Sequence, residues 1–320
     1  MAGSLPSSWT ISAEDSTRIF HDTIAPQEVG PYLHLHHKDD GKQPLAVLIV
    51  GQTGAGKTRL APELKQAMTD LGRDPAHFIA DTYKTYHPHY AECLRTQPDK
   101  ASILAGTAAR QWLSMACEHA AARRLDVLVE SACRHPDDFC RLAEIFRTGG
   151  YKVRVAIMAV PEALSRIGVL VRYHRKLPEA QSGGLPLRMT PKKVHDDSYA
   201  GLAYAADFID ANPAVVDSVI VARRYNMVAY RNEPSPESGG WLLEGRVVAA
   251  LEAERRRKLS PEESKTAMED VAELKQLEDP RVRAQLPEIE ILLGHLDADP
   301  EGLASLEPLD PAAFVGRGLQ

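Results

Sequence analysis

The chain has 320 residues, enough for one large α/β domain and an addition, because single domains commonly contain roughly 100 to 200 residues. Its 38 Lys and Arg against 44 Asp and Glu give a net charge of -6, which excludes the broad basic surface of a protein that coats nucleic acid. A small anionic substrate in a local basic pocket is compatible with this balance.

The cysteines and the N-terminus indicate a reduced protein that is soluble in the cytoplasm. The four cysteines show neither C-x-x-C spacing nor the pattern of a small secreted disulfide framework. The N-terminus lacks a basic segment followed by an apolar core, and no run of about eighteen apolar residues occurs. We therefore expect a cytoplasmic location, and neither a membrane nor a nucleic acid as partner.

Residues 1–44 are expected to form a short N-terminal helix and a loop. Ser12 is of a residue type that caps helices, and apolar residues follow it at helical spacing as far as Ile24. The polar loop that comes next contains three histidines without a partnering Cys or Glu, so we interpret it as a solvated surface and not as a metal site.

From Leu45 onward, short apolar runs alternate with longer segments of helical periodicity. Such runs are typical of strands buried on both faces, and the segments between them are long enough for helical crossovers. We therefore predict, for residues 45–230, an α/β fold with a mostly parallel sheet and helices on both faces. The predicted strands are 46–50, 77–80, 126–130, 153–160 and 218–222.

Residues 231–320 are predicted to be a linker and a helical C-terminal extension without evident chemistry. After Tyr230 the composition changes to RNEPSPESGG, which is typical of a linker. Charged amphipathic helices follow, and the clearest of them starts with Ser260 and Pro261, where Glu263 would complete a capping box.

The first motif with chemistry is a phosphate-binding loop between an apolar strand and a helical segment. Its glycines let backbone N–H groups close around phosphate oxygens, and the helix N-terminus adds a positive dipole end. Lys57 would bridge the outer phosphates, and Thr58 would offer a hydroxyl to Mg²⁺. The loop predicts nucleotide binding, and it matches G-x-x-x-x-G-K-[ST] with Gly51, Gln52, Thr53, Gly54, Ala55, Gly56, Lys57 and Thr58.

Two acidic residues follow strands at the edge of the sheet where ligands bind in open α/β folds. Asp81, in HFIADTYK, could accept a proton from an attacking hydroxyl, or it could simply cap the next helix. Glu130 ends the run DVLVE. In a motor ATPase it would assist Mg²⁺ or polarise water, and in a kinase it would bind a substrate hydroxyl. It could also be a carboxylate that only favours a helix start.

Arginines gather in the next part of the chain. Arg166, Arg172 and Arg175 fall in a helical segment after Pro161, and Arg188 lies in GGLPLRMTPKK. A lid that brings guanidinium groups to the transferred phosphoryl group is one interpretation, and a solvated charged face is the other.

Five segments in order, GQTGAGKT, ADTYKTYHP, LVESACR, MAVPEALSRIGVLVRYH and LRMTPKKVHD, resemble the zeta toxin family of bacterial P-loop kinases. The resemblance covers roughly residues 45 to 230. It implies a P-loop NTPase-type fold and transfer of phosphate from ATP or GTP, with Mg²⁺, to the 3'-hydroxyl of the amino sugar of UDP-N-acetylglucosamine. It also implies an antitoxin that blocks the nucleotide site, a role that the C-terminal extension could take over as a self-inhibiting segment.

The resemblance also implies roles for individual residues. Asp81 looks like the base that deprotonates the sugar hydroxyl, and Glu130 would hold the sugar, with Arg134 of the same motif as a further substrate-binding residue. Arg172 and Arg188 would clamp the migrating phosphate, and Lys57 and Thr58 would keep their P-loop roles.

The sequence departs from the family where Ser131 and Ala132 follow Glu130, in place of the family's frequent glycine and threonine. The contacts to the sugar are therefore less determined than the reaction class. Two alternatives stay open: a kinase of another small hydroxyl compound, such as a different nucleotide sugar, an antibiotic, a nucleoside or a dinucleotide, and a nucleotide-gated binding module whose turnover is incidental.

Overall fold

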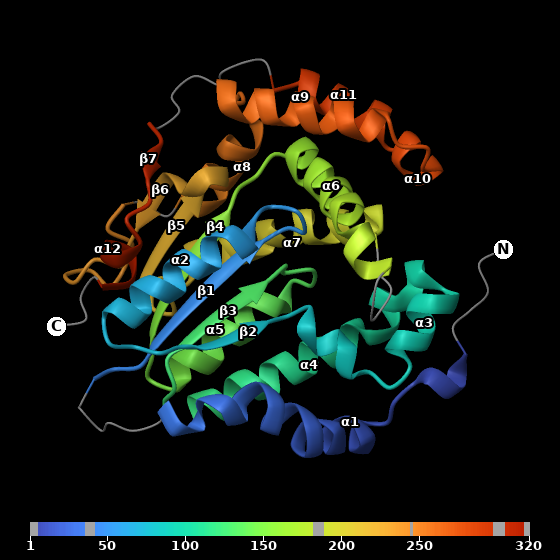
Figure 1. The fold of residues 1–320 in the computed structure, drawn as a ribbon. Coiled ribbons are helices and arrows are strands. Elements are labelled where there is room, and N and C mark those ends of the chain that lie inside the picture. The colour runs from blue at the N-terminus through green and yellow to red at the C-terminus, as the bar shows by residue number, and fades with distance from the viewer. Residues whose placement is uncertain (1–5, 36–41, 182–188, 244–245, 297–304, 317–320) are drawn as a thin grey trace.

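The fold is built on one sheet of seven strands, ordered β2-β3-β1-β4-β5-β6-β7 (Figure 1). The computed structural model describes residues 6–35, 42–181, 189–243, 246–296 and 305–316. The strands are β1 Leu45–Gly51, β2 Ala76–Ile79, β3 Val127–Ser131, β4 Lys152–Met158, β5 Ser218–Ala222, β6 Met227–Asn232 and β7 Glu307–Pro308.

The sheet is mostly parallel, as predicted. Neighbouring strands among β1 to β5 pair in parallel. At one edge, β6 pairs antiparallel with β5, and β7 pairs antiparallel with β6. Strand β6 runs through Tyr230 to Asn232, so the predicted linker begins inside a strand, because β6 forms a hairpin with β5. The late strand β7 then brings the C-terminal segment to the same sheet edge. The division of the chain at residues 44 and 230 stays a prediction.

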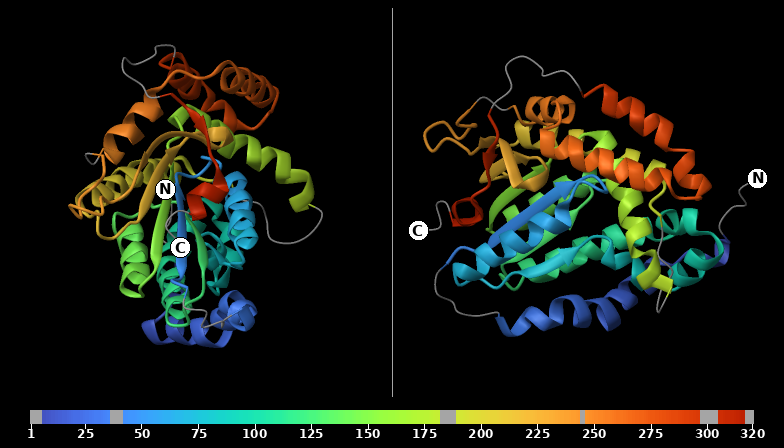
Figure 2. Two further views of the ribbon diagram at one scale, coloured as in Figure 1. Left: turned by 90° about the vertical axis from the view of Figure 1, so that its left-hand side faces the viewer. Right: turned by 45° about the horizontal axis from the view of Figure 1, so that its top comes forward.

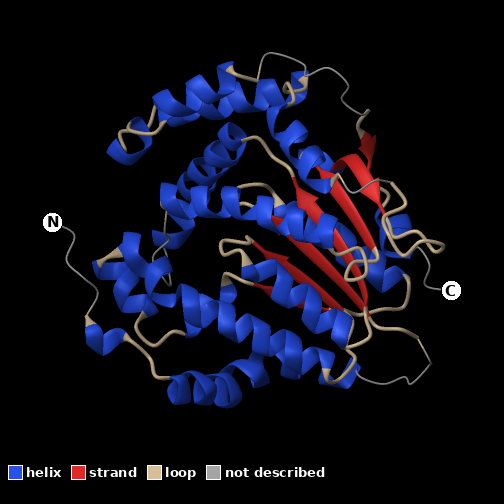
Figure 3. Cartoon of the chain, turned by 180° about the vertical axis from the view of Figure 1, so that it is seen from behind, coloured by secondary structure: helices blue, strands red, loops and turns tan. Residues whose placement is uncertain are grey.

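Helices cover both faces of the sheet (Figure 3). Successive residues of β1 face opposite sides, so Val47 packs in one apolar core and Leu48 in the other. The Val47 face is covered by α2 Lys57–Asp70, α6 Glu162–Gln181, α9 Pro261–Lys275, α10 Pro280–Arg283, α11 Leu286–Gly294 and α12 Pro311–Gly316. The Leu48 face is covered by α4 Ala101–Ala121, α5 Asp137–Thr148, α7 Lys192–Ala211 and α8 Val247–Arg256.

The N-terminal segment forms a helix that packs against α4. Helix α1 spans Ala13–Ile19, and the hydroxyl of Ser12 accepts a hydrogen bond from the Asp15 backbone, as expected of a cap. The chain continues as a wider, π-type helix, Phe20–Val29. The indole of Trp112 donates to the carbonyl of Ser16, which fixes α1 on α4.

The C-terminal helices α9, α10 and α11 lie along α6 (Figure 1). Helix α9 has the predicted capping box between Ser260 and Glu263, with Pro261 in its first turn. The chain then returns to the sheet, and Figure 2 shows α12 beside α2. No helix in the described part of the chain is both long and apolar enough to cross a membrane.

Candidate active site

The phosphate-binding loop connects β1 to α2 as the motif predicts. Gly54 and Gly56 have φ values of 84° and 105°, in the left-handed region that favours glycine. A Cβ at Gly54 would also lie 2.1 Å from the carbonyl oxygen of Ser165, so α6 approaches the loop too closely for any side chain there. Helix α2 begins at Lys57, which directs its N-terminal N–H groups toward the loop.

Hydrogen bonds from three directions hold this loop in place. The backbone N–H of Thr53 donates to Ser198 Oγ of α7 over 3.1 Å. The guanidinium of Arg224, in the turn after β5, donates to the carbonyl oxygen of Gly54 over 3.1 Å. Lys57 Nζ donates to the carbonyl oxygen of Gly51 over 2.5 Å, so the loop's backbone and its lysine are both positioned before any ligand contact.

The Lys57 ammonium is the central charge of the site. Desolvation by the surrounding protein lowers its pKa, and the carboxylates of Asp81 and Glu130 oppose that effect. Lys57, Asp81 and Glu130 all line one cavity. A lysine that shares a cavity with two carboxylates and a phosphate-binding loop suits the transfer of a phosphoryl group.

A cavity of about 850 Å³ opens over the loop, and we call it the donor cavity. Its size falls within the roughly 300 to 1,000 Å³ that is usual for small-molecule sites. It contains the loop and other predicted residues, and it adds residues from the β5–β6 turn and α9. Its lining includes Thr53, Gly54, Ala55, Gly56, Lys57, Thr58, Asp81, Glu130, Arg172, Arg175, Arg224, Tyr225, Asn226, Thr266 and Asp270.

Asp81 and Glu130 come together because β2 and β3 are neighbours. Glu130 pairs in register with Ile79 of β2, and its carbonyl oxygen accepts a hydrogen bond from Ala80 N over 3.0 Å. Glu130 is buried and lies 2.9 Å from His77 Nε2. The Asp81 side chain is 68% exposed, and it accepts a hydrogen bond from the buried Lys84 over 2.5 Å. Asp81 is therefore held in place yet open to a ligand.

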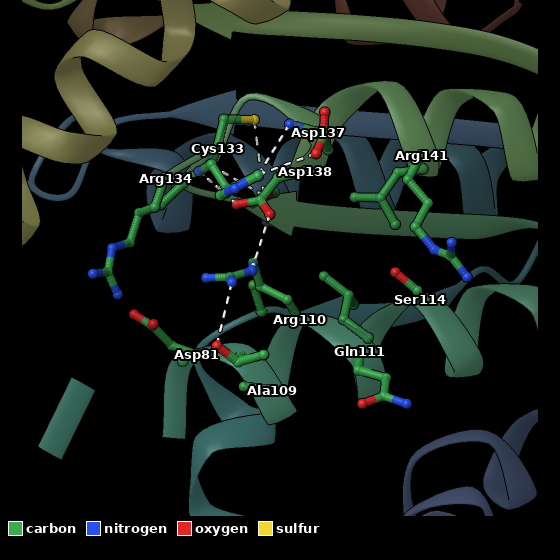
Figure 4. Close-up of a pocket in the computed structure, with 18 of the residues that line it drawn as sticks. Asp81, Ala109, Arg110, Gln111, Ser114, Cys133, Arg134, Asp137, Asp138 and Arg141 are labelled. Atoms are coloured by element: carbon green, nitrogen blue, oxygen red, sulfur yellow. Dashed lines mark hydrogen bonds and ion pairs between the residues drawn. The ribbon is translucent and has the colours of Figure 1, made fainter. Parts of the chain in front are cut away.

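A second cavity of about 440 Å³, the acceptor cavity, adjoins the donor cavity. Ala80, Asp81 and Ala132 line both. Arg134, predicted to bind substrate, lines the acceptor cavity. In Figure 4, Asp81, Arg110 and Arg134 lie at one end of this cavity and Arg141 lies at the other.

Carboxylates partly balance the arginines of the acceptor cavity. Arg110 Nε lies 3.4 Å from Asp138, and Arg134 lies 3.8 Å from Asp197. Burial raises the pKa of the Asp138 carboxyl, while the His135 backbone N–H and the Arg110 guanidinium lower it. Burial also raises the pKa of the neighbouring Cys133 thiol to about 12, so this cysteine is a thiol and not a nucleophilic thiolate at neutral pH.

The structure separates the predicted arginines. Arg172 and Arg175 of α6 line the donor cavity. Arg166 is buried and forms ion pairs with Glu162 and Glu288, so its role is in packing the C-terminal helices. Arg175 pairs with α9 carboxylates, whereas no ion pair to Arg172 occurs among the described residues. Arg188 lies outside the described residues, and its role as a phosphate clamp stays a prediction.

The sequence-based interpretation missed several residues of the site. His77 lies two residues before Ile79, the residue of β2 that pairs with Glu130. Lys84 follows Asp81 by three residues, a spacing that places both side chains on one side of a helical turn. Arg224 and Tyr225 belong to no sequence motif, and they reach the site through the turn that follows β5. The extension from residue 231 was expected to lack chemistry, but Thr266 and Asp270 of α9 line the donor cavity.

The geometry defines a P-loop α/β protein in which a phosphate-binding loop faces a strand-end aspartate across one cavity. The model of the Zeta toxin family matches residues 33–235. The chain belongs to this family.

Known relatives agree with that assignment. Toxin PezT of Streptococcus pneumoniae serotype 4 is 29% identical over 160 residues, which cover 50% of this chain and 60% of PezT. Toxin zeta of Enterococcus hirae is 24% identical over 156 residues, which cover 48% of this chain and 52% of that toxin. The match thus spans between 52% and 60% of the length of these relatives.

A solved structure shares the fold. It comes from the PezAT chromosomal toxin-antitoxin system of Streptococcus pneumoniae, and its TM-score is 0.60 at 17% sequence identity. The superposition covers 84% of this chain and 100% of that chain.

Proposed function

We propose that this protein is a small-molecule kinase and the toxin of a toxin-antitoxin pair. It transfers the γ-phosphoryl group of ATP or GTP to the 3'-hydroxyl of the amino sugar of UDP-N-acetylglucosamine. The observation that carries the reaction class is the position of Asp81, whose side chain lines both the donor cavity and the acceptor cavity. A base shared by two cavities stands where a donor phosphate and an acceptor hydroxyl would meet.

The reaction needs one new bond and one proton acceptor. The acceptor oxygen bonds to the γ-phosphorus, the bond from the γ-phosphorus to the β,γ-bridging oxygen breaks, and the hydroxyl proton moves to the Asp81 carboxylate. The Lys84 ammonium, 2.5 Å from that carboxylate, holds it in position. Lys57 and Arg172, which both line the donor cavity, offset negative charge that spreads over the transferred phosphoryl oxygens.

The donor cavity also fits Mg²⁺ by the chemistry of its oxygen donors. Thr58 is exposed in the first turn of α2, and the carboxylates of Asp81 and Glu130 line the same cavity. Mg²⁺ prefers oxygen ligands and usually binds one or two protein groups together with phosphate oxygens. When bound, it would supply charge neutralisation at the phosphates, held by Thr58.

The acceptor cavity supports an anionic, hydroxyl-bearing substrate. Arg110, Arg134, Arg141 and Lys84 line it, and arginine forks bind phosphate oxygens in pairs. A sugar linked to UDP carries such a diphosphate. Because Ser131 and Ala132 line this cavity where the family often has glycine and threonine, a kinase of another small hydroxyl compound is the second candidate.

A product assay tests the proposal. The full-length protein is incubated with Mg-ATP and a panel of UDP-sugars, nucleosides and aminoglycosides, and products are identified by mass spectrometry. We expect one phosphate on UDP-N-acetylglucosamine, formed about 100-fold more slowly or slower still with the Asp81→Asn variant. Phosphorylation of another compound would select the second candidate, while hydrolysis of ATP without transfer to any acceptor would overturn both.

The proposed partner is an antitoxin protein that covers the donor cavity. The structural relative comes from a toxin-antitoxin system, which supports this pairing. Inducible expression in a walled bacterium tests it: growth should stop with the wild type and continue with Lys57→Ala. Equal growth of both strains, with equal protein levels, would contradict a toxin role.

A further inference from the structure

Part of the donor cavity is lined by residues that are assigned neither to the phosphates of the nucleotide nor to the acceptor. The phosphate-binding loop accounts for one wall, and Asp81, which lines both cavities, lies on the side that continues into the acceptor cavity. A further wall is formed by residues of the β5–β6 turn and of α9: Arg224, Tyr225, Asn226, Thr266 and Asp270. This wall does not line the acceptor cavity, so it faces space that a donor nucleotide would use beyond its phosphates.

Tyr225 is unusual within this wall. Its φ of 59° and that of Asn226, 55°, are both left-handed, and such a conformation costs a tyrosine free energy. Tyr225 is 42% exposed and lines the cavity, although a large aromatic residue would normally be buried. Strained residues of this kind are found at ligand sites, where the surrounding structure holds them in place.

The turn and α9 are held rigidly to the rest of the site. Arg224 donates to the carbonyl oxygens of Gly54 and Leu164, so the turn is tied to the phosphate-binding loop and to α6. The buried guanidinium of Arg223 lies 2.8 Å from Glu263 and ties the same turn to α9. The hydroxyl of Tyr225 is 3.3 Å from Thr266 Oγ1, which fixes the tyrosine against that helix.

We propose that Tyr225 and Thr266 form the base-binding site of the donor nucleotide, with the ring of Tyr225 stacked on the base. The inference rests on the proposed function only in taking a nucleoside triphosphate as the donor. An aromatic face binds a base through stacking, and a nearby hydroxyl can hydrogen-bond to the ribose or the base edge. The C-terminal helical segment thereby becomes part of the nucleotide site.

Binding measurements separate the base from the phosphates. Full-length protein is titrated by calorimetry with Mg-ATP and with Mg-tripolyphosphate, which has the phosphates but no base. Tyr225→Asn removes the ring and keeps a residue that tolerates the left-handed region. We expect about tenfold weaker ATP binding, corresponding to about 1.4 kcal/mol, with tripolyphosphate binding unchanged.

Further variants keep this test decisive. Tyr225→Phe should retain ATP affinity if stacking dominates, and Thr266→Val, which preserves the side-chain shape, should weaken ATP binding by about twofold to fivefold. Tyr204→Asn alters another exposed tyrosine, on α7, that lines neither cavity, and should change nothing. Unchanged ATP affinity in Tyr225→Asn, or an equal loss for tripolyphosphate, would overturn the inference.

The assay distinguishes this inference from the proposed function. If ATP binding depends on Tyr225 but no phosphoryl transfer is detected, the base site stands and the kinase proposal fails. If transfer occurs and the KM for ATP is the same in wild type and Tyr225→Asn, the kinase stands and the base site fails. A protein that binds neither ATP nor tripolyphosphate would overturn both.

Discussion

The donor and acceptor sides of the site are built in different ways. The phosphate-binding loop is one continuous stretch between β1 and α2, and its ligand groups are largely backbone N–H groups and a helix N-terminus. The acceptor side combines side chains that follow β2 and β3 with side chains from α4 and α5. Local geometry therefore determines where a phosphate binds, whereas the order of strands in the sheet determines what lies opposite it.

This difference predicts that acceptor-side substitutions change transfer without changing nucleotide binding. The largest effect is expected from Asp81→Asn, which removes the proton acceptor but preserves the shape of the side chain. We expect kcat to fall by about 100-fold or more, since a positioned base contributes roughly 10² to 10⁴. Calorimetry should show unchanged ATP affinity. Asp99→Asn, in the exposed segment before α4, is the control; a loss of ATP binding in Asp81→Asn would blur the distinction between the two sides.

Glu130→Gln, at a carboxylate that lines the donor cavity, should have a smaller effect on use of the acceptor. The substitution keeps a hydrogen-bonding group 2.9 Å from His77 but removes the charge that would accept a substrate hydroxyl. A lost hydrogen bond to a charged group is worth about 1.5 to 3 kcal/mol, so the KM for the acceptor should rise by about tenfold or more. Initial rates at varied acceptor and fixed, saturating ATP measure this. If instead the KM for ATP rises and the KM for the acceptor does not, Glu130 belongs to the donor side.

Gly168→Ala tests the packing behind the phosphate-binding loop. A Cβ there would lie 2.8 Å from the Arg224 guanidinium and 3.0 Å from the carbonyl oxygen of Gly54. Overpacking of this kind should lower the free energy of unfolding by about 1 to 3 kcal/mol and weaken ATP binding, because Arg224 must move. Gly294→Ala is the matched control, since a Cβ at Gly294 meets nothing within 4 Å. Urea unfolding of both variants measures the difference; equal effects would show that Gly168 is not constrained by the loop.

His195→Gln is expected to have the smallest effect, on the pH dependence of stability. His195 is buried behind the loop, where its carbonyl oxygen accepts a hydrogen bond from Ser198. Burial lowers the pKa of this imidazole, and the adjacent Asp196 opposes that effect. The unfolded chain therefore takes up the proton at a higher pH than the folded chain does. The stability contributed by the neutral imidazole is complete above a pH of about 6.5 and is lost as the pH falls below it.

Urea unfolding at pH 7.5 and pH 5.5 tests this sign. Below a pH of about 6.5, the free energy of unfolding of the wild type should fall more steeply with pH than that of His195→Gln. The difference in slope should be up to about 1.4 kcal/mol per pH unit. His135→Gln, an exposed histidine, is the control and should keep the wild-type slope. A wild-type slope in His195→Gln would show that other groups carry the pH dependence.

The donor and acceptor sides of the site also differ in how much of them could be predicted from the sequence. The parallel sheet, the capping box at Ser260 and the phosphate-binding loop were predicted correctly, because each depends on neighbouring residues: apolar runs, cap residues, and glycines at fixed spacing. Asp81 and Glu130 could be placed at strand ends, but only the pairing of β2 with β3 shows that they line one cavity. Strand β6 continues through Tyr230 to Asn232, beyond the residue where the linker was expected to begin, because β6 pairs with β5.

The sequence by itself determined where phosphate binds and which residue types could carry phosphoryl transfer, since those features are set by local backbone geometry and side-chain chemistry. Only the tertiary structure decided which charges are used for packing and which face the ligand. It paired Arg166 with Glu288 in the packing of α6 against α11, and left Arg172 in the donor cavity. It also brought Tyr225 and α9 beside the loop. The reason is that long-range contacts depend on how elements distant in the chain pack together, and no short segment records that packing.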